Sequence, residues 1–311
     1  MGSGPLRAHA RVEKELFEKL HYAEQATSGV LVLEGRELPT DAPSMLVAVV
    51  PSHTMRQVIG EVAPLIPPRA LVVTASKGIE NQTQATMVEV LQQVLSPALA
   101  QRIAVLSGPS FARETAEGHP TAVVAAAAAR PIAEEVQRAF QVNAFRVYTS
   151  DDVVGVEVGG AVKNVIALAC GMADGLGFGH NTRAAAITRG LAEISRLAVR
   201  LGGNPLTLAG LAGLGDLVLT CNGPQSRNRT AGVMLGQGKS LQQVLTEMKQ
   251  VAEGIKTTRS VRELAVRVGV EMPISSAIYK VLYEDHPVGQ VMTDLLGRPP
   301  RHEPMKGTLH S

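Results

Sequence analysis

The chain has 311 residues, of which 45% are hydrophobic, 19% are charged and only 3% are aromatic. This composition excludes a disordered chain and suits one large folded domain or two modest ones. The 30 basic and 28 acidic residues leave a net charge of +2, so no overall field attracts nucleic acid or a membrane surface. A site for an anionic ligand must therefore be built locally.

The two cysteines, Cys170 and Cys221, stand far apart in the sequence, and neither belongs to a CxxC motif. We therefore expect neither a disulfide framework nor a zinc site, and this usage fits a reducing, cytoplasmic setting. The N-terminus has no apolar segment of signal-peptide length, and the apolar run TAVVAAAAA is too short to cross a bilayer. We expect no membrane insertion.

The first residues, MGSGPLRAH, contain Gly2 and Gly4, which look like the start of a phosphate-binding glycine loop. That motif needs a strand before it and a helix after it. Here no strand precedes the glycines, and Arg7 stands where a third glycine is needed. We instead expect one amphipathic helix over residues 10–25 and a strand over residues 29–35.

The chain then alternates apolar, β-branched runs with helical stretches. Five runs are predicted to be strands: residues 44–50, 70–76, 102–108, 121–127 and 145–150. Two helical stretches separate the first three of them: residues 53–66 and 84–95. The first three runs are apolar on both faces, which is typical of parallel strands buried between helices. Residues 1–150 are therefore predicted to form an α/β domain with a doubly wound parallel sheet.

From about residue 151 to residue 311 the spacing becomes helical throughout, which predicts an all-α second domain. In the segment 184–203, Glu193 is expected on a polar face, opposite the apolar face that carries Ile194. Residues 240–243 form a capping box that opens another helix.

Two strand ends carry residues that suit an anion. Lys77 directly follows the second apolar run, and Gly108 and Ser110 follow the third. Ligands of open α/β sheets bind at the carboxyl ends of the strands, where a lysine and free backbone amides can reach them. The alternatives are an exposed loop lysine and an ordinary strand-to-helix turn.

Lys163 lies in the middle of the helical stretch VEVGGAVKNVIALACGMA, which is apolar nearly all round and therefore expected to be buried. A buried lysine needs a partner, and its pKa shifts easily, which suits proton transfer. Asp216, flanked by glycines and leucines, is a natural candidate for that partner. The alternative is a lysine whose ammonium group reaches the surface.

Ser226, Arg227 and Asn228 precede a further helical stretch, and Ser226 is expected to cap it. A helix N-terminus beside an arginine is a phosphate-binding arrangement. The alternative is a solvated, capped turn with surface arginines.

Taken together, the segments SKGIE, SGPSFARE with HPTAVV, VEVGGAVKNVIALACG, GLAGLGDLVLTC, SRNR and VAEG occur in an order that resembles the bacterial-type NAD(P)-dependent glycerol-3-phosphate dehydrogenases. The resemblance covers most of the chain, from about residue 44 to residue 298. It implies a Rossmann-like nucleotide-binding domain followed by a helical catalytic domain. It also implies reduction of dihydroxyacetone phosphate to sn-glycerol 3-phosphate by NADPH or NADH, which supplies phospholipid synthesis.

The resemblance also assigns roles. Lys163 matches the general acid/base, and Asp216 and Thr220 match the positions beside it. The residues matching substrate contacts, besides Lys163 and Asp216, are Lys77, Gly108, Ser110, Ser226, Arg227 and Asn228. Those matching cofactor contacts are Lys77, Ala112, Arg227, Val251 and Glu253. A homodimer is a further expectation from the family.

One part of the family pattern, the first strands with their glycine loop, is not found in this sequence. Two interpretations stay open at this point: an active dehydrogenase, or a truncated, inactive relative that keeps only the half that binds the phosphorylated triose. If the first strand is missing, the run at residues 44–50 becomes an exposed edge, unless residues 29–35 cover it. A relative from the hydroxyacid or 6-phosphogluconate dehydrogenases is disfavoured by SRNR and SKGIE.

Overall fold

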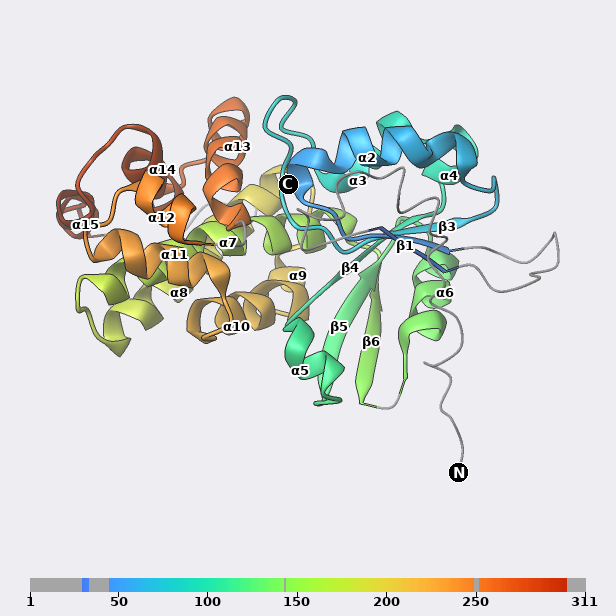
Figure 1. Cartoon of the computed structure of the whole chain (residues 1–311), viewed down its shortest axis with the longest axis horizontal. Coiled ribbons are helices and arrows are strands. Elements are labelled where there is room, and N and C mark those ends of the chain that lie inside the picture. The colour runs from blue at the N-terminus through green and yellow to red at the C-terminus, as the bar shows by residue number, and fades with distance from the viewer. Residues whose placement is uncertain (1–29, 34–44, 143, 249–251, 301–311) are drawn as a thin grey trace.

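The computed structural model describes residues 30–33, 45–142, 144–248 and 252–300 (Figure 1). A six-stranded sheet lies on one side of the molecule, and a group of helices lies on the other. The glycine pair at Gly2 and Gly4, the expected helix over 10–25 and Val251 fall outside these residues.

The sheet contains all the strands that the sequence predicts, in the order β1-β2-β3-β4-β5-β6. Their bounds are β1 (Val30–Leu33), β2 (Met45–Ala48), β3 (Leu71–Thr74), β4 (Ile103–Ser107), β5 (Thr121–Ala126) and β6 (Phe145–Ser150). β1 pairs antiparallel with β2 along its whole length, from Val30 opposite Ala48 to Leu33 opposite Met45. The expected strand at residues 29–35 therefore does cover the edge of β2.

The sequence predicted a parallel sheet. Parallel pairs do dominate the sheet, but two of its neighbouring pairs are antiparallel. β2, β3 and β4 run parallel, and so do β5 and β6, whereas β5 runs antiparallel to β4. The reason lies in the connections. A short link that contains only α5 (Ala112–Ala116) turns the chain straight back beside β4, whereas α6 (Arg130–Phe140) forms the crossover that a parallel β5–β6 pair requires.

Helices cover both faces of the sheet, which explains why its central strands are apolar on both faces (Figure 1). On one face lie α2 (Met55–Val62), α3 (Met87–Val94) and α4 (Pro97–Ala100), with the short helices η2 (Ser52–Thr54) and η3 (Ala63–Leu65), and on the other lies α6. Val72 packs into the core beneath α2 and α3, while its neighbour Leu71 packs into the core beneath α6. Alternate residues of one strand thus serve two hydrophobic cores.

The second half is helical, as predicted, and is built around α7 (Val153–Gly175). The other helices are α8 (His180–Arg200), α9 (Pro205–Leu208), η4 (Leu211–Gly215), α10 (Asp216–Asn222), α11 (Arg227–Gly236), α12 (Leu241–Glu247), α13 (Glu253–Val268), α14 (Pro273–Tyr283) and α15 (Val288–Leu296). By length and composition alone α7 could cross a membrane, but 83% of its most apolar stretch is buried inside the protein. It is the central helix of this core, where Cys170 and Cys221 are both buried and free.

Glycines let α7 and α11 meet backbone to backbone. A Cβ on Gly171 would lie 2.1 Å from the carbonyl oxygen of Arg229, and one on Gly232 would lie 2.2 Å from that of Leu168. No side chain fits at either position, so the small residues of the sequence fix how closely α11 approaches α7.

Glu193, expected on the polar face of α8, is instead buried against a second helix. Its carboxylate is buried and accepts hydrogen bonds from the backbone N–H groups of Ile274 (2.5 Å) and Ser275 (3.1 Å). α14 has no cap from its own first residues, so this carboxylate serves its N-terminus from another helix. Burial raises the pKa of Glu193.

Candidate active site

A cavity of about 770 Å³ lies where the carboxyl ends of the strands meet the helical half. The residues predicted as site residues that line it are Lys77, Ser110, Ala112, Lys163, Thr220, Ser226, Arg227, Asn228 and Glu253. Segments far apart in the sequence thus converge on one volume. Gly108 and Asp216 lie directly behind this lining, and Val251 falls outside the described part of the chain.

Parallel strands bring the first two segments together. β3 and β4 are neighbours, so Lys77 after β3 and Gly108 after β4 emerge at the same edge of the sheet. Gly78 has a φ of +157°, and a Cβ there would lie 2.4 Å from the Ser52 hydroxyl, so only glycine fits directly after Lys77. The Lys77 stem in turn runs against Gly160 of α7, where a Cβ would lie 3.5 Å from it.

Asp216, the first residue of α10, holds both lysines with its two carboxylate oxygens. Lys163 Nζ lies 2.5 Å from Oδ1, and Lys77 Nζ lies 2.5 Å from Oδ2. Lys163 also donates to the Thr220 hydroxyl oxygen at 2.8 Å, and that hydroxyl donates to the Asp216 carbonyl oxygen at 2.7 Å. Asp216, the partner of Lys163 expected from the sequence, is therefore present. Lys77 is a second cation on the same carboxylate, which the sequence did not predict.

Burial and neighbouring charge tune this cluster. Burial lowers the pKa of Lys163 most, the positive charge of Lys77 lowers it further, and Asp216 acts against both, so that the pKa falls to about 8. Burial raises the pKa of Asp216, but the two lysines outweigh it and hold the carboxyl below its ordinary value. At neutral pH the cluster therefore combines an ionised carboxylate with a lysine that can exchange a proton.

The start of α11 forms the opposite side of the cavity. Ser226 caps the helix by accepting from the Arg229 backbone N–H at 3.2 Å, as its sequence position predicts. Arg227 is exposed at the first helical position, beside the N–H groups of the first turn. Such a turn with an exposed guanidinium is suited to an anion such as a phosphate group.

Asn228 and Glu253 connect α11 to the start of α13. The Asn228 side-chain oxygen accepts from the Gly254 backbone N–H at 2.8 Å, which fixes the first turn of α13 against α11. Glu253, the first residue of that helix, is half-buried. Desolvation raises the pKa of its carboxyl, while the charge of Arg227 acts in the opposite direction. The sequence did not predict this connecting role of Asn228.

Five polar lining residues were missed by the sequence reasoning: Ser76, Ser107, Arg113, Asn164 and Gln225. The Ser107 hydroxyl is buried and has no hydrogen-bond partner within the described ranges. A buried, unpaired hydroxyl on a cavity wall is suited to a polar ligand that completes it. Ser107 directly precedes Gly108, and Asn164 directly follows Lys163. This position next to a predicted site residue was the sequence feature that could have identified them.

Similarity to known proteins was found at the levels of sequence and structure. The family profile described as NAD-dependent glycerol-3-phosphate dehydrogenase N-terminus matches residues 37–133, and that described as the C-terminus matches residues 152–293. A glycerol-3-phosphate dehydrogenase [NAD(P)+] of Geobacter metallireducens is 55% identical over 279 residues, which are 90% of this chain and 83% of that protein. One of Geobacter sulfurreducens is 58% identical over 81% of this chain and 76% of its own length.

The same similarity holds for a solved structure. The crystal structure of glycerol-3-phosphate dehydrogenase from Coxiella burnetii is 40% identical, has a TM-score of 0.78, and is matched over 82% of this chain and 77% of that one. The similarity thus extends over both the sheet and the helices that form the cavity.

Proposed function

Because the chain belongs to the family of NAD(P)-dependent glycerol-3-phosphate dehydrogenases, we propose that it interconverts dihydroxyacetone phosphate and sn-glycerol 3-phosphate with NADH or NADPH. The observation that carries this proposal is the Lys77–Asp216–Lys163 cluster on the wall of a cavity that also holds Arg227 and a capped helix start. A proton donor and a phosphate site are the two things that this substrate requires.

Lys163 acts as the general acid/base. When bound, the dinucleotide supplies the hydride that adds to the carbonyl carbon of the substrate. The carbonyl oxygen gains negative charge as the C=O electron pair moves onto it, and Lys163 Nζ gives it a proton. In the reverse direction neutral Lys163 removes the hydroxyl proton. Asp216 and Thr220 hold Nζ in place through both steps.

The phosphate group binds at the other side of the cavity. Arg227 and the first turn of α11, capped by Ser226, supply positive charge and N–H donors, and Ser110 and Asn228 supply further polar groups. Lys77 lines the cavity, and Gly108 lies directly behind it, where its carbonyl oxygen accepts from Lys77 Nζ at 3.5 Å. Because these groups contact the phosphate before and during the reaction, they contribute to binding more than to the chemical step.

The described residues fit the nicotinamide end of the cofactor. The unpaired Ser107 hydroxyl supports binding of a polar ligand at this wall, and Ala112, Arg227, Glu253 and Lys77 are the lining residues that would hold it. Val251 is assigned to the cofactor as well, by its match to the family. A cytoplasmic location, a homodimer and a role in phospholipid synthesis belong to the same proposal.

The proposal is tested by following NADPH and NADH oxidation by the purified chain with dihydroxyacetone phosphate. Saturable turnover is expected with at least one cofactor, and a much higher KM is expected for unphosphorylated dihydroxyacetone. Binding of sn-glycerol 3-phosphate by calorimetry without any turnover would instead favour the inactive, triose-binding relative. If the chain shows no turnover and also binds no sn-glycerol 3-phosphate, the assignment of the site is overturned.

A further inference from the structure

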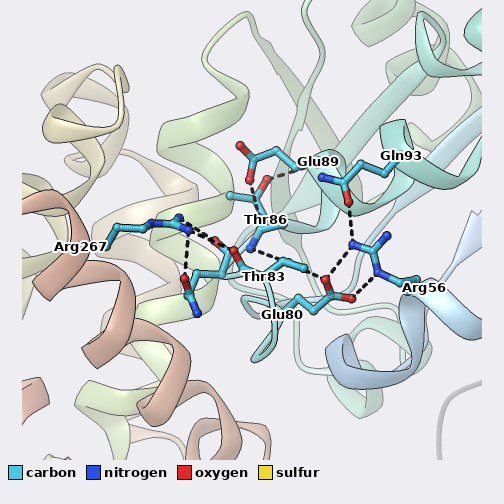
Figure 2. Close-up of polar contacts among 9 residues, drawn as sticks. Arg56, Glu80, Thr83, Thr86, Glu89, Gln93 and Arg267 are labelled. Carbon is cyan, nitrogen blue, oxygen red and sulfur yellow. Dashed lines mark hydrogen bonds and ion pairs between the residues drawn. The ribbon is translucent and has the colours of Figure 1, made fainter.

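Residues 79–86, here called the 79–86 loop, follow Lys77 and Gly78 in the chain and end at the start of α3. Figure 2 shows Glu80, Thr83 and Thr86 of this loop. The loop is closed on itself by backbone hydrogen bonds from Glu80 N to the Ala85 oxygen and from Gln84 N to the Glu80 oxygen, both 2.9 Å. Its last residue, Thr86, forms a capping box with Glu89 at the start of α3. The loop is therefore an ordered unit whose beginning carries Lys77.

Arg56 of α2 fixes the loop from the sheet side with a two-pronged contact. Arg56 Nε donates to Glu80 Oε1 at 2.9 Å, and Nη2 donates to Oε2 at 2.7 Å (Figure 2). Thr83 donates to the same carboxylate at 2.5 Å, and Arg56 Nη2 also reaches Gln93 of α3 at 2.7 Å. The hydrogen bond from Arg56 lowers the pKa of Glu80, so the carboxylate stays ionised at neutral pH.

The helical half holds the same loop from the other side. Arg267 of α13 donates to the Thr83 carbonyl oxygen at 3.1 Å and to the Gln84 side chain at 2.9 Å (Figure 2). Ile79 is buried in the core of the helical half rather than in either core of the sheet. α13 itself begins at Glu253 in the cavity, so one helix contacts both the cavity and the loop.

We propose that Arg56 and Glu80 are positioning residues for Lys77, which they hold against Asp216 by fixing the 79–86 loop between the sheet and the helical half. The inference rests on the proposed function, because it concerns the lysine that contacts both Asp216 and the substrate. Only Gly78 and Ile79 separate Lys77 from Glu80, and both are packed tightly, at Ser52 and in the helical core. A displacement of Glu80 is therefore transmitted directly to the Lys77 backbone.

Among the described residues, a second arginine–glutamate pair touches no site residue. Arg102 Nη2 donates to both carboxylate oxygens of Glu135, at 3.2 Å and 2.9 Å, on the α6 side of the sheet. The side chains are 28% and 27% exposed, against 35% and 10% for Arg56 and Glu80. Glu135→Gln is thus the control for Glu80→Gln: each removes the negative charge of an arginine–glutamate pair, but only one affects the loop.

The first readout needs no turnover. The purified chain is treated with trace acetic anhydride, and acetylation of Lys77 is measured by mass spectrometry relative to the exposed Lys280. In the wild type Asp216 engages the Lys77 amine. Glu80→Gln is expected to raise Lys77 acetylation several-fold, and Glu135→Gln to leave it unchanged. Equal Lys77 acetylation in the wild type and Glu80→Gln would overturn the proposal.

The second readout is the pH dependence of dihydroxyacetone phosphate reduction. The pKa of Lys163 responds to Lys77 and Asp216, and Glu253 and Cys221 also lie within its field. If Lys77 moves away in Glu80→Gln, its charge no longer lowers the pKa of Lys163, and that pKa rises. Lys163 then stays protonated to higher pH, so the fall in reduction rate at high pH shifts to higher pH. The same variant should lower kcat about tenfold at neutral pH, since small misplacements of reacting groups are costly.

Arg56→Lys is the second variant, which keeps the positive charge but loses the two-pronged contact with Glu80. Its Lys77 acetylation and its kcat are expected to lie between those of the wild type and those of Glu80→Gln. Thermal unfolding of all variants separates loss of fold from loss of position. An inactive wild type would count against the proposed function alone, because Lys77 acetylation still decides the loop proposal. Unshifted pH profiles in both loop variants would count against the loop proposal alone.

Discussion

The two ends of the cavity are built differently. At the Lys163 end, ionised side chains are almost fully buried: Lys163 is 6% exposed and Asp216 is 1% exposed. At the α11 end, Arg227 is exposed, and the groups beside it are a capping hydroxyl and the N–H groups of a helix start. Burial shifts pKa values and makes a charge depend on its partner, whereas an exposed charge keeps its solvent shell. We infer that the buried end performs proton transfer and the exposed end binds phosphate.

The largest expected effect comes from removing the proton donor. Lys163→Met keeps most of the side-chain volume, and Asp216 keeps Lys77 as its partner, so the fold should persist. We expect kcat to fall by about 10²- to 10⁴-fold, the usual contribution of a general acid, with little change in KM. Steady-state kinetics decide this, and an unchanged kcat would remove Lys163 from the mechanism.

Asp216→Asn should affect both stability and rate. It leaves two neighbouring lysines without their shared carboxylate, and breaking a buried ion pair costs about 3–5 kcal/mol of unfolding free energy. Asp174→Asn is the control, because Asp174 also joins two cations, Arg183 and Arg229, but outside the cavity lining. Chemical denaturation should show losses in both variants, whereas only Asp216→Asn should lower kcat in the molecules that remain folded.

Arg227→Ala tests the exposed end. The loss of charge-assisted hydrogen bonds to phosphate, worth about 1.5–3 kcal/mol, should raise KM for dihydroxyacetone phosphate by about 10- to 100-fold while kcat changes little. Arg229→Ala, two residues further along α11, removes an arginine held by Asp174 and should reduce stability instead. A fall in kcat at unchanged KM in Arg227→Ala would contradict the division between the two ends.

The pH dependence sharpens the same division. Reduction needs protonated Lys163, so its rate should fall as pH rises through the pKa of about 8, by tenfold per unit well above it. Oxidation of sn-glycerol 3-phosphate needs the neutral amine, so its rate should rise over the same range. Full pH profiles of kcat in both directions measure this, and parallel changes would argue against a single acid/base group.

The smallest expected effect is on a helix cap. Ser226→Ala and Ser240→Ala each remove a capping hydroxyl, so each should lower the unfolding free energy by about 1 kcal/mol. Only Ser226 lines the cavity, so only its replacement should raise KM. Equal KM values in the two variants would restrict Ser226 to a structural role.

Sequence patterns were sufficient wherever the signal is local. The apolar run around Leu71 and Val72 predicted a strand buried on both faces, and Ser226 and Ser240 predicted two helix starts, because these depend on neighbouring residues alone. The direction of β5 was not predicted, since it depends on how the short link after β4 turns. The place of Glu193 was missed for a similar reason, because its partners lie on α14.

The sequence by itself predicted the strands, the buried position of Lys163 and, through the family resemblance, a set of site residues, most of which line one cavity. Only the tertiary structure decided that one carboxylate, that of Asp216, contacts both Lys77 and Lys163. It also decided that Arg56 and Arg267 donate hydrogen bonds to the 79–86 loop from its two sides. The spacing of apolar residues over a short segment indicates which face of a strand or helix is buried. Contacts between residues 139 positions apart, such as Lys77 and Asp216, are set by the packing of whole helices against the sheet.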